Sequence, residues 1–413
     1  MYGLSDNLFA IITSSENIRQ AYFDLVKKFE AKSKGRTYRG LDGVKLRSLD
    51  YVSKDIFPRI QVEMKNFTPL TPAYGMGIPK KNGGKRNIYI YSIVDRIKAE
   101  AIYRVLEPIF DKHFSPFLFS YRASHPSYYA ARSAVRRYKR YFGTDHVLVA
   151  DIASYADTID HEILVQKLKK AGLDEKTLKL INLFIDARSY EDGAIVSRAG
   201  KAILTGSPLY ALLANFYMDD FDKWAGKKVA LYRRVGDDII AFDQNAEKVR
   251  ALHEELLKVT KQLKISVNTQ KGRLIRSDEP FNFLGYAFRD GKIGYDASSV
   301  EKIVASWKKV IGSSRMRTPS ARVKIVQKLF QGESNMRHEF QQLIDQKVLV
   351  DDTDQVKALS ERFIELVTRF IQGRSTPKNR RLIAPLFQDV HMPTLFSLYR
   401  QKHFSPTHEY TSH

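Results

Sequence analysis

The feature that most constrains the fold is a set of three aspartates at the ends of short apolar segments. Residues 146–152 form an apolar run of strand length whose carboxylate, Asp151, comes near its end. Two further strand-like segments, 229–235 and 239–242, are joined by Gly236-Asp237-Asp238, a connection typical of a hairpin tip. The chain is therefore expected to contain strands that present carboxylates at their ends.

Carboxylates in this arrangement suit chemistry on nucleotides. In two-metal phosphoryl transfer one ion activates the attacking hydroxyl and the other holds the leaving group, and Mg²⁺ prefers oxygen ligands. Carboxylates on two adjacent strands can bridge both ions. Gly and Asp also favour ordinary turns, however, and Asp151 can simply cap the segment that follows it. The aspartates alone leave both interpretations open.

Helical patterns surround these strands, so we expect a mixed α and β protein. In chain order the expected elements are helix before residue 51, a basic hairpin at 78–91, helices at 93–110, 209–221 and 249–263, a hairpin formed by 281–286 and 293–295, and helices after about residue 296. The clearest of these late helices has a cap at Asp352 or Thr353 and a terminator at Gly373.

The composition narrows the class of protein. The 413 residues are 43% hydrophobic and include no Cys, which indicates a globular chain with room for two to four domains at roughly 100–200 residues each. Without Cys there are no disulfides, thiolate metal sites or cysteine nucleophiles. The apolar stretch at 8–12 is far shorter than the roughly 20 residues that cross a bilayer. We expect a soluble, cytoplasmic protein with no membrane partner.

The charge of the chain indicates a polyanionic partner. The formal net charge is +22 with His neutral, and nucleic acid is the commonest polyanion in a cell. Arg132, Arg136 and Arg140 share one helical face, and we call them the arginine ridge. Like charges four residues apart weaken an isolated helix by a few tenths of a kcal/mol, and a phosphate backbone would offset this repulsion. A plain solvated surface is the alternative.

Six short blocks occur in an order that resembles the bacterial reverse transcriptases, the group that includes group II intron, retron and defence-associated enzymes. Each block alone is weak, but the ordered series over about residues 70–290 is specific. The blocks are Ile78-Pro79-Lys80-Lys81-Asn82-Gly83-Gly84-Lys85-Arg86 with 95–97 and 106–110, Phe119-Ser120-Tyr121-Arg122, 151–161, 206–209 with Leu212-Leu213-Ala214-Asn215, Val235-Gly236-Asp237-Asp238, and Lys271 with Phe283-Leu284-Gly285-Tyr286.

This resemblance implies an α+β right-hand polymerase fold. An N-terminal helical extension would cover residues 1–70, fingers and palm with an antiparallel palm sheet would cover 71–295, and a helical thumb with a C-terminal extension would cover 296–413. The implied reaction is RNA-directed DNA polymerisation, with an RNA template, dNTPs and a DNA product. Residues from 301 onward carry 19 Lys or Arg against 11 Asp or Glu, which suits contacts to a duplex backbone.

The resemblance also implies roles for individual residues. Asp151 and Asp237 would ligate two Mg²⁺ ions, with Mn²⁺ as the alternative metal, and Asp238 would be the less direct third carboxylate. Lys271 would be the acid that protonates pyrophosphate, unless it is an ordinary surface lysine. Gly206 belongs to the template and nucleotide block.

Two further groups would contact the substrate and the nucleic acid. Phe283-Leu284-Gly285 would form the primer grip, although its aromatic residue fits an ordinary core as well. The basic residues of the fingers hairpin would meet the incoming triphosphate, with a solvated charged turn as the alternative; they are Lys80, Lys81, Lys85 and Arg86.

Three positions depart from the pattern of the family. Most relatives have an aromatic residue five places after the first aspartate, where its bulk excludes the ribose 2′-hydroxyl, but this chain has Ala156 with Tyr155 beside it. Val235 replaces the Tyr of Tyr-x-Asp-Asp, and Thr205 replaces a Gln. Gly-Asp-Asp also resembles the viral RNA-dependent RNA polymerases, so a ribonucleotide polymerase is the main alternative. The blocks at 212–215 and 283–286 favour the reverse transcriptase, and we expect Tyr155 to compensate in part and DNA to be the product.

Within the group, elimination favours a stand-alone, defence-associated enzyme. No Cys/His-rich endonuclease follows the helical region, and Leu366-Val367-Thr368-Arg369 does not supply the Val-Thr-Gly typical of retron enzymes. We therefore expect action with a dedicated non-coding RNA in antiphage defence, a role that rests on family analogy. A non-catalytic, maturase-like RNA-binding scaffold is a further alternative, and the oligomeric state is left open.

Overall fold

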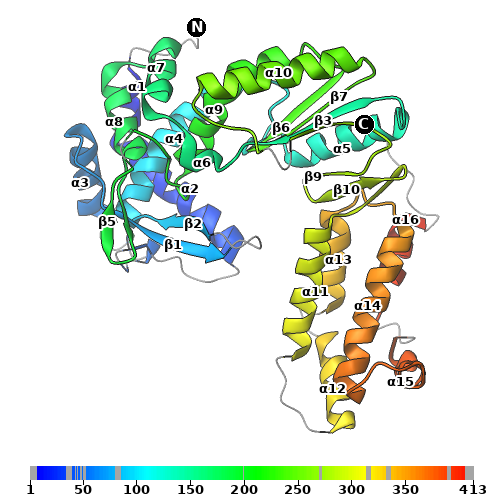
Figure 1. Cartoon of the computed structure of the whole chain (residues 1–413). Coiled ribbons are helices and arrows are strands. Elements are labelled where there is room, and N and C mark those ends of the chain that lie inside the picture. The colour runs from blue at the N-terminus through cyan, green and yellow to red at the C-terminus, as the bar shows by residue number, and fades with distance from the viewer. Residues whose placement is uncertain are drawn as a thin grey trace. The chain divides into compact units, whose positions relative to one another are not determined.

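The computed structural model describes residues 7–33, 40, 41, 43, 45, 46, 49, 53–79, 85–198, 200–268, 272–312, 318–331, 336–387 and 392–404. The chain divides into two compact units (Figure 1). Unit 1 contains Met1–Ala130 and His146–Leu274, and unit 2 contains Ala131–Asp145 and Ile275–His413. This division does not fall at residues 70 and 295, so those expected boundaries stay predictions.

Unit 1 is built from helices and two sheets. Its helices are α1 (Leu8–Ile12), α2 (Ser15–Ser33), α3 (Ser53–Lys65), α4 (Ile93–His113), α6 (Tyr155–Thr158), α7 (His161–Ala171), α8 (Glu175–Ile185), α9 (Pro208–Ala225) and α10 (Ala246–Gln262). Its strands are β1 (Ala73–Pro79), β2 (Lys85–Ile90), β3 (His146–Asp151), β4 (Ser189–Glu191), β5 (Ala194–Val196), β6 (Leu231–Val235) and β7 (Asp238–Asp243).

Two elements cross the division, and the remainder belong to unit 2. The crossing elements are α5 (Ser127–Arg140) and β8 (Arg273–Arg276). Unit 2 then contains β9 (Phe281–Phe283), β10 (Tyr286–Arg289), β11 (Lys292–Tyr295), α11 (Ala297–Gly312), α12 (Pro319–Leu329), α13 (Met336–Gln346), α14 (Thr353–Gln372), α15 (Pro377–Ile383), the 3-10 helix Ala384–Phe387 and α16 (Leu395–Phe404).

The first sheet of unit 1 has the strand order β2-β1-β4-β5. β1 and β2 are antiparallel, with Met76 opposite Ile88, and β1 runs parallel to β4. The antiparallel strand pair predicted for the basic hairpin at 78–91 is thus confirmed, although β1 begins earlier, at Ala73. The turn of this hairpin, residues 80–84, lies outside the described residues. β4 and β5 were not predicted, because three-residue strands are too short to give a periodic signal.

The second sheet carries the three aspartates and has the order β6-β7-β3-β8. β7 pairs antiparallel with both β3 and β6, which confirms the strand and the hairpin predicted from the apolar runs. Helix α10 packs on β3 and β7 and buries Leu252 and Leu256 (Figure 1). The amphipathic helix predicted at 249–263 is therefore the cover of this sheet.

Helix α9 begins with strong local signals. The Ser207 side chain caps it by accepting a hydrogen bond from the Leu209 N–H at 3.2 Å. Pro208 occupies the first turn, where an N–H has no partner within the helix. The helix predicted at 209–221 is confirmed and continues to Ala225. It packs against α4, so both helices lie in the core of unit 1.

Unit 2 combines a small antiparallel sheet, in the order β11-β10-β9, with a helical bundle. In the bundle the rings of Trp307, Phe340 and Phe363 cluster with centroid separations of 5.0 to 5.7 Å. Asp352 caps α14 by accepting a hydrogen bond from the Gln355 N–H, as predicted. Together the two units confirm the expected α+β class.

Candidate active site

The carboxylates predicted from the sequence meet at the ends of two neighbouring strands. Asp151 ends β3 and lies directly opposite Asp238, the first residue of β7. The Ile152 N–H donates to the Asp237 carbonyl at 3.0 Å, which ties the two strand ends together. Asp151 is 8% exposed, Asp238 is half-buried and Asp237 is exposed. The sheet therefore presents one sheltered and two accessible carboxylates at a single edge.

A second segment holds Asp151 from the other side. The Asn268 N–H donates to the Asp151 carbonyl at 2.7 Å, and the Asn268 side-chain amide donates to Oδ2 at 3.3 Å. Asn268 thus restrains both the backbone carbonyl and the side-chain carboxylate of Asp151. Lys271, the predicted acid, lies outside the described residues.

The chemistry of these donors suits Mg²⁺. Within the part of the chain that the structure describes, no three His, Asp or Glu side chains converge as a ready-made metal site. Mg²⁺ is commonly held by one or two carboxylates together with substrate phosphates rather than by protein ligands alone. Asp151, Asp238 opposite it and the neighbouring Asp237 supply oxygen donors of this kind. The residues therefore fit a metal that binds together with a nucleotide.

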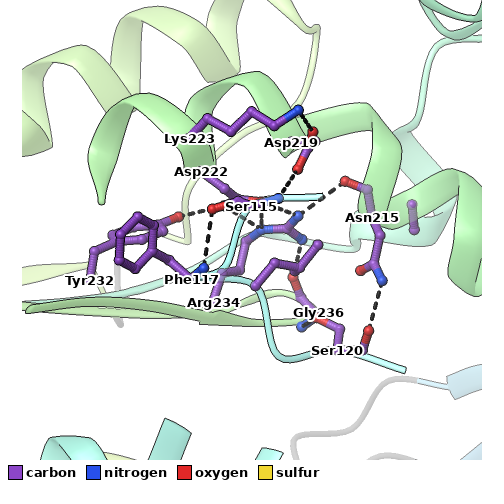
Figure 2. Close-up of polar contacts among 12 residues, drawn as sticks. Ser115, Phe117, Ser120, Asn215, Asp219, Asp222, Lys223, Tyr232, Arg234 and Gly236 are labelled. Carbon is purple, nitrogen blue, oxygen red and sulfur yellow. Dashed lines mark hydrogen bonds and ion pairs between the residues drawn. The ribbon is translucent and has the colours of Figure 1, made fainter. Parts of the chain in front are cut away.

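The turn that carries Asp237 is fixed by contacts from outside the hairpin. Gly236 has a φ of 66°, a conformation that glycine adopts readily, and an added Cβ would meet no atom within 4 Å. The Gly236 N–H donates to the Ser120 Oγ, and Arg234 Nη1 donates to the Gly236 carbonyl at 2.9 Å. Figure 2 shows these contacts converging on the turn.

Arg234 belongs to a buried ion pair that the sequence analysis missed. Its guanidinium and the Asp222 carboxylate are both 0% exposed. Arg234 Nε donates to Asp222 at 2.8 and 3.0 Å and Nη2 donates at 2.6 Å, while the Tyr232 hydroxyl donates to the same carboxylate at 2.7 Å (Figure 2). Burial acts to lower the pKa of Arg234, but Asp222 outweighs it and raises the pKa.

A sequence signal for this pair does exist. Arg233 and Arg234 are adjacent in a strand, so their side chains point to opposite faces and one must turn toward the core. The carboxylate Asp222 lies in the last turns of the mostly buried helix α9. A buried arginine needs such a partner. Which of the two arginines turns inward depends on the strand register, which the sequence does not give.

Tyr155 lies elsewhere than predicted. It is 4% exposed, and its hydroxyl donates to the Ala214 carbonyl in α9 at 2.6 Å. Tyr155 is therefore a core residue, and we withdraw it as a wall of the sugar pocket. Ala156 beside it is half-buried, so its small side chain leaves this position without an aromatic ring.

An aromatic pair near Asp237 was also not predicted as part of the site. The rings of Tyr121 and Tyr210 meet edge to face with centroids 6.4 Å apart. Tyr121 is 62% exposed. Burial raises the pKa of Tyr210, and the neighbouring Tyr121 and Asp237 raise it further. Both tyrosines stand within quoted sequence blocks or beside them, but only the structure brings them together.

Gly206, just before α9, lies in close backbone contact with β2. Its φ is 99°, and an added Cβ would lie 2.2 Å from the Tyr89 carbonyl oxygen of β2. The neighbouring Thr205 hydroxyl donates to the Asn87 carbonyl at 3.1 Å. Only glycine permits this approach, so Gly206 has a structural reason to be at the predicted position.

The predicted triphosphate contacts are only partly described. Lys85 and Arg86 are the first residues of β2, opposite Pro79 and Ile78 in register. Lys80 and Lys81 lie outside the described residues. The roles of all four basic residues stay predictions.

The arginine ridge lies on α5 as predicted. Arg132 is half-buried, and Arg136 and Arg140 are exposed. Neighbouring Arg137 is instead paired with Asp145 through two hydrogen bonds of 2.6 and 2.7 Å. Among the described residues no carboxylate pairs with the three ridge arginines, so their charge is available to an outside anion.

The predicted primer grip is a tight turn within unit 2. Leu284 and Gly285 have φ values of 51° and 78°, and Lys347 Nζ donates to the Leu284 carbonyl at 2.7 Å. Phe283 is 3% exposed, so its ring belongs to the core, the alternative that the sequence had left open. The role of Phe283, Leu284 and Gly285 as a primer grip stays a prediction.

Comparison with known proteins gives one family. A sequence model of the family described as reverse transcriptase (RNA-dependent DNA polymerase) matches residues 78–288, just over half of the 413 residues.

In the described part of the chain, no helix has the length and apolar character that crossing a bilayer requires.

Three relatives illustrate the range of the similarity. Protein YkfC from Escherichia coli (strain K12) is 24% identical over 325 residues, 68% of this chain and 82% of YkfC. The group II intron-encoded protein LtrA from Lactococcus lactis subsp. cremoris is 27% identical over 206 residues, 49% of this chain and 33% of LtrA. A putative COX1/OXI3 intron 1 protein from Saccharomyces cerevisiae is 23% identical over 232 residues, 56% of this chain and 26% of that protein. The chain thus spans a third or less of the two intron relatives.

Proposed function

Because the chain belongs to the reverse transcriptase family, and so is a nucleotidyltransferase of the RNA-directed DNA polymerase type, we propose that Asp151, Asp237 and Asp238 form its catalytic centre. The observation that carries the proposal is the register of β3 and β7, which sets Asp151 opposite Asp238 and joins Ile152 to Asp237. The family that the sequence blocks predicted is confirmed by the comparisons.

In this proposal the carboxylates of Asp151 and Asp237 hold two Mg²⁺ ions, or Mn²⁺ in their place, and Asp238 supports them from the start of β7. The bound ions supply activation of the primer hydroxyl and stabilisation of the phosphate charge. Lys271 protonates the departing pyrophosphate. The basic residues of the fingers hairpin attract the triphosphate, namely Lys80, Lys81, Lys85 and Arg86.

Nucleic acid is held by the two other predicted groups. In the arginine ridge Arg136 and Arg140 are exposed and Arg132 is half-buried. Among the described residues no carboxylate pairs with them, which favours contact with a phosphate backbone. The turn at Leu284 and Gly285 supports the primer end through its backbone, since the Phe283 ring is buried. An RNA template and a DNA product are the partners expected for the family.

The double variant Asp237→Ala with Asp238→Ala tests the catalytic centre. Mg²⁺-dependent dNTP incorporation should fall by at least about 100-fold, since the ligands that organise the charged transition state are gone. RNA binding and the unfolding transition should be retained. Asp220→Ala is the matched control, because Asp220 is an exposed carboxylate of α9 that pairs with Lys167. Full incorporation by the double variant would refute the assignment.

A ribonucleotide-tolerant polymerase is the second candidate, and it is favoured by the placement of Tyr155 in the core beside the small Ala156. If the wall beneath the sugar is open, Ala156→Phe should raise the preference for dNTP over NTP by about 5- to 150-fold, the equivalent of about 1–3 kcal/mol. Tyr155→Phe is the control and should leave sugar preference unchanged. A change in the control would restore Tyr155 as a sugar contact.

The biological role that we propose is cytoplasmic antiphage defence with a dedicated non-coding RNA. The support is the departure of Leu366-Val367-Thr368-Arg369 from the retron pattern, together with family analogy. Sequencing the RNA that co-purifies with the protein, and the product made from added dNTPs, would identify template and product together. Phage protection by the wild type that is lost in the Asp237→Ala and Asp238→Ala variant would support the role, and equal plaque counts would oppose it.

A further inference from the structure

The Arg234 side chain makes hydrogen bonds in addition to its ion pair with Asp222. A buried ion pair is rarely needed for stability, because apolar residues of similar size often serve equally well. Arginine differs from such residues in its rigid fork of five N–H donors. Here two donors that the ion pair leaves free reach backbone carbonyls, that of Gly236 at 2.9 Å and that of Asn215 at 3.2 Å.

These contacts complete a set that fixes every peptide group around Asp237. The Gly236 N–H donates to Ser120 Oγ, the Gly236 carbonyl accepts from Arg234, and the Asp237 carbonyl accepts from the Ile152 N–H. The Gly236 carbonyl and the Asp237 N–H belong to the same peptide plane. Arg234 therefore holds the Gly236 carbonyl (Figure 2). Through this peptide plane it restricts the backbone that carries Asp237.

The turn needs such outside support. Gly236 is at positive φ and has no side chain that could pack, so its conformation depends on the hairpin and on the contacts of its peptide groups. Ligands of a catalytic metal must be held within about 0.5 Å of their working geometry. Of the three outside contacts, only the one from Arg234 comes from an ionised group, and charge-assisted hydrogen bonds are roughly twice as strong as neutral ones.

We propose that Arg234 is a positioning residue, whose guanidinium sets the direction of the Asp237 carboxylate through the Gly236 carbonyl, and that Asp222 keeps the guanidinium in place. This inference rests on the proposed function of Asp237. Replacement of Arg234 need not unfold β6, because its backbone is held independently: its N–H donates to the Phe117 carbonyl at 3.1 Å and its carbonyl accepts from the Phe119 N–H at 2.8 Å.

Arg234→Lys tests the proposal, because lysine can still pair with Asp222 but lacks the planar fork. The kcat for dNTP incorporation should fall by about 10- to 100-fold, as expected for a misplaced catalytic group, while KM for dNTP changes by less than about threefold. Arg233→Lys is the matched control on the opposite face of the strand, over the rings of Phe117 and Phe119, and should leave kcat unchanged.

Hydrogen exchange followed by mass spectrometry gives a readout that needs no activity. In Arg234→Lys the amides of 235–238 should exchange at least about tenfold faster than in the wild type and in Arg233→Lys. Unchanged kcat and exchange in folded Arg234→Lys would overturn the proposal, as would a loss of kcat that only follows the loss of folded protein. An inactive wild type would instead refute the proposed function, and the exchange comparison would still decide the role of Arg234.

A second variant covers the outcome in which Arg234→Lys does not fold. The triple change Asp222→Leu, Tyr232→Phe and Arg234→Met removes all side-chain polar groups of the pair and of Tyr232 while keeping similar volumes. The proposal expects it to fold, to lose kcat and to exchange rapidly at 235–238. Wild-type kcat in this variant would overturn the proposal.

Discussion

Asp222→Ala should be among the most destabilising single changes in unit 1. It leaves the Arg234 guanidinium, 0% exposed, without the acceptor of three hydrogen bonds. Breaking a buried pair in this way costs about 3–5 kcal/mol. The Tyr232 hydroxyl loses its acceptor as well, at a further cost of about 1–3 kcal/mol. Even the lower bound of about 3 kcal/mol for the ion pair alone corresponds to a fall in Tm of roughly 6 °C, at about 2 °C per kcal/mol for a domain of this size.

The assay can be confined to unit 1. The chain has two Trp residues, of which Trp224 lies in unit 1 and Trp307 in unit 2. In a Trp307→Phe background, urea unfolding followed by fluorescence reports on the surroundings of Trp224 alone. The triple variant of Asp222, Tyr232 and Arg234 should recover most of the lost free energy of unfolding. A loss below about 1 kcal/mol in Asp222→Ala, or a triple variant no more stable than the single one, would refute the reasoning.

Three further predictions concern other contacts of the chain. Gly206→Ala should lower Tm clearly more than Gly193→Ala, because both glycines have positive φ but only at Gly206 would the new Cβ strike backbone, the Tyr89 carbonyl; equal losses would contradict this. Partial burial acts to raise the pKa of Asp160, but the Lys264 hydrogen bond and nearby N–H groups hold it below its usual value; its charge therefore adds stability above about pH 4 that is lost on acidification. The stability difference between wild type and Asp160→Asn, measured from pH 7 to pH 3, should shrink as the pH falls, and a constant difference would argue against it. Replacing the arginine ridge by Gln should reduce the slope of log K against log salt for RNA binding by about 2, since each phosphate contact contributes about 0.7 to 0.9; an unchanged slope would remove the ridge from the interface.

The sequence predicted those parts of the structure that depend on local patterns. The apolar run before Asp151, the hairpin at Gly236 and the cap at Asp352 each follow from periodicity or turn chemistry within a few residues. The inward turn of Arg234, by contrast, depends on which face of β6 meets α9. The same applies to Tyr155, whose acceptor in α9 lies 59 residues further along the chain. Tertiary packing determines such long-range contacts, and the periodicity of the sequence gives no information about them.

The buried pair also has an evolutionary consequence. If either Asp222 or Arg234 changes alone, the other becomes an uncompensated charge in the core, and the loss of about 3–5 kcal/mol is a large part of the 5–15 kcal/mol by which a typical domain is stable. Selection for stability therefore opposes a substitution of only one of the two residues, whereas an apolar replacement of both can be equally stable. Lineages of this chain should keep both residues or replace both, and sequences with only one of them should carry a compensating change nearby.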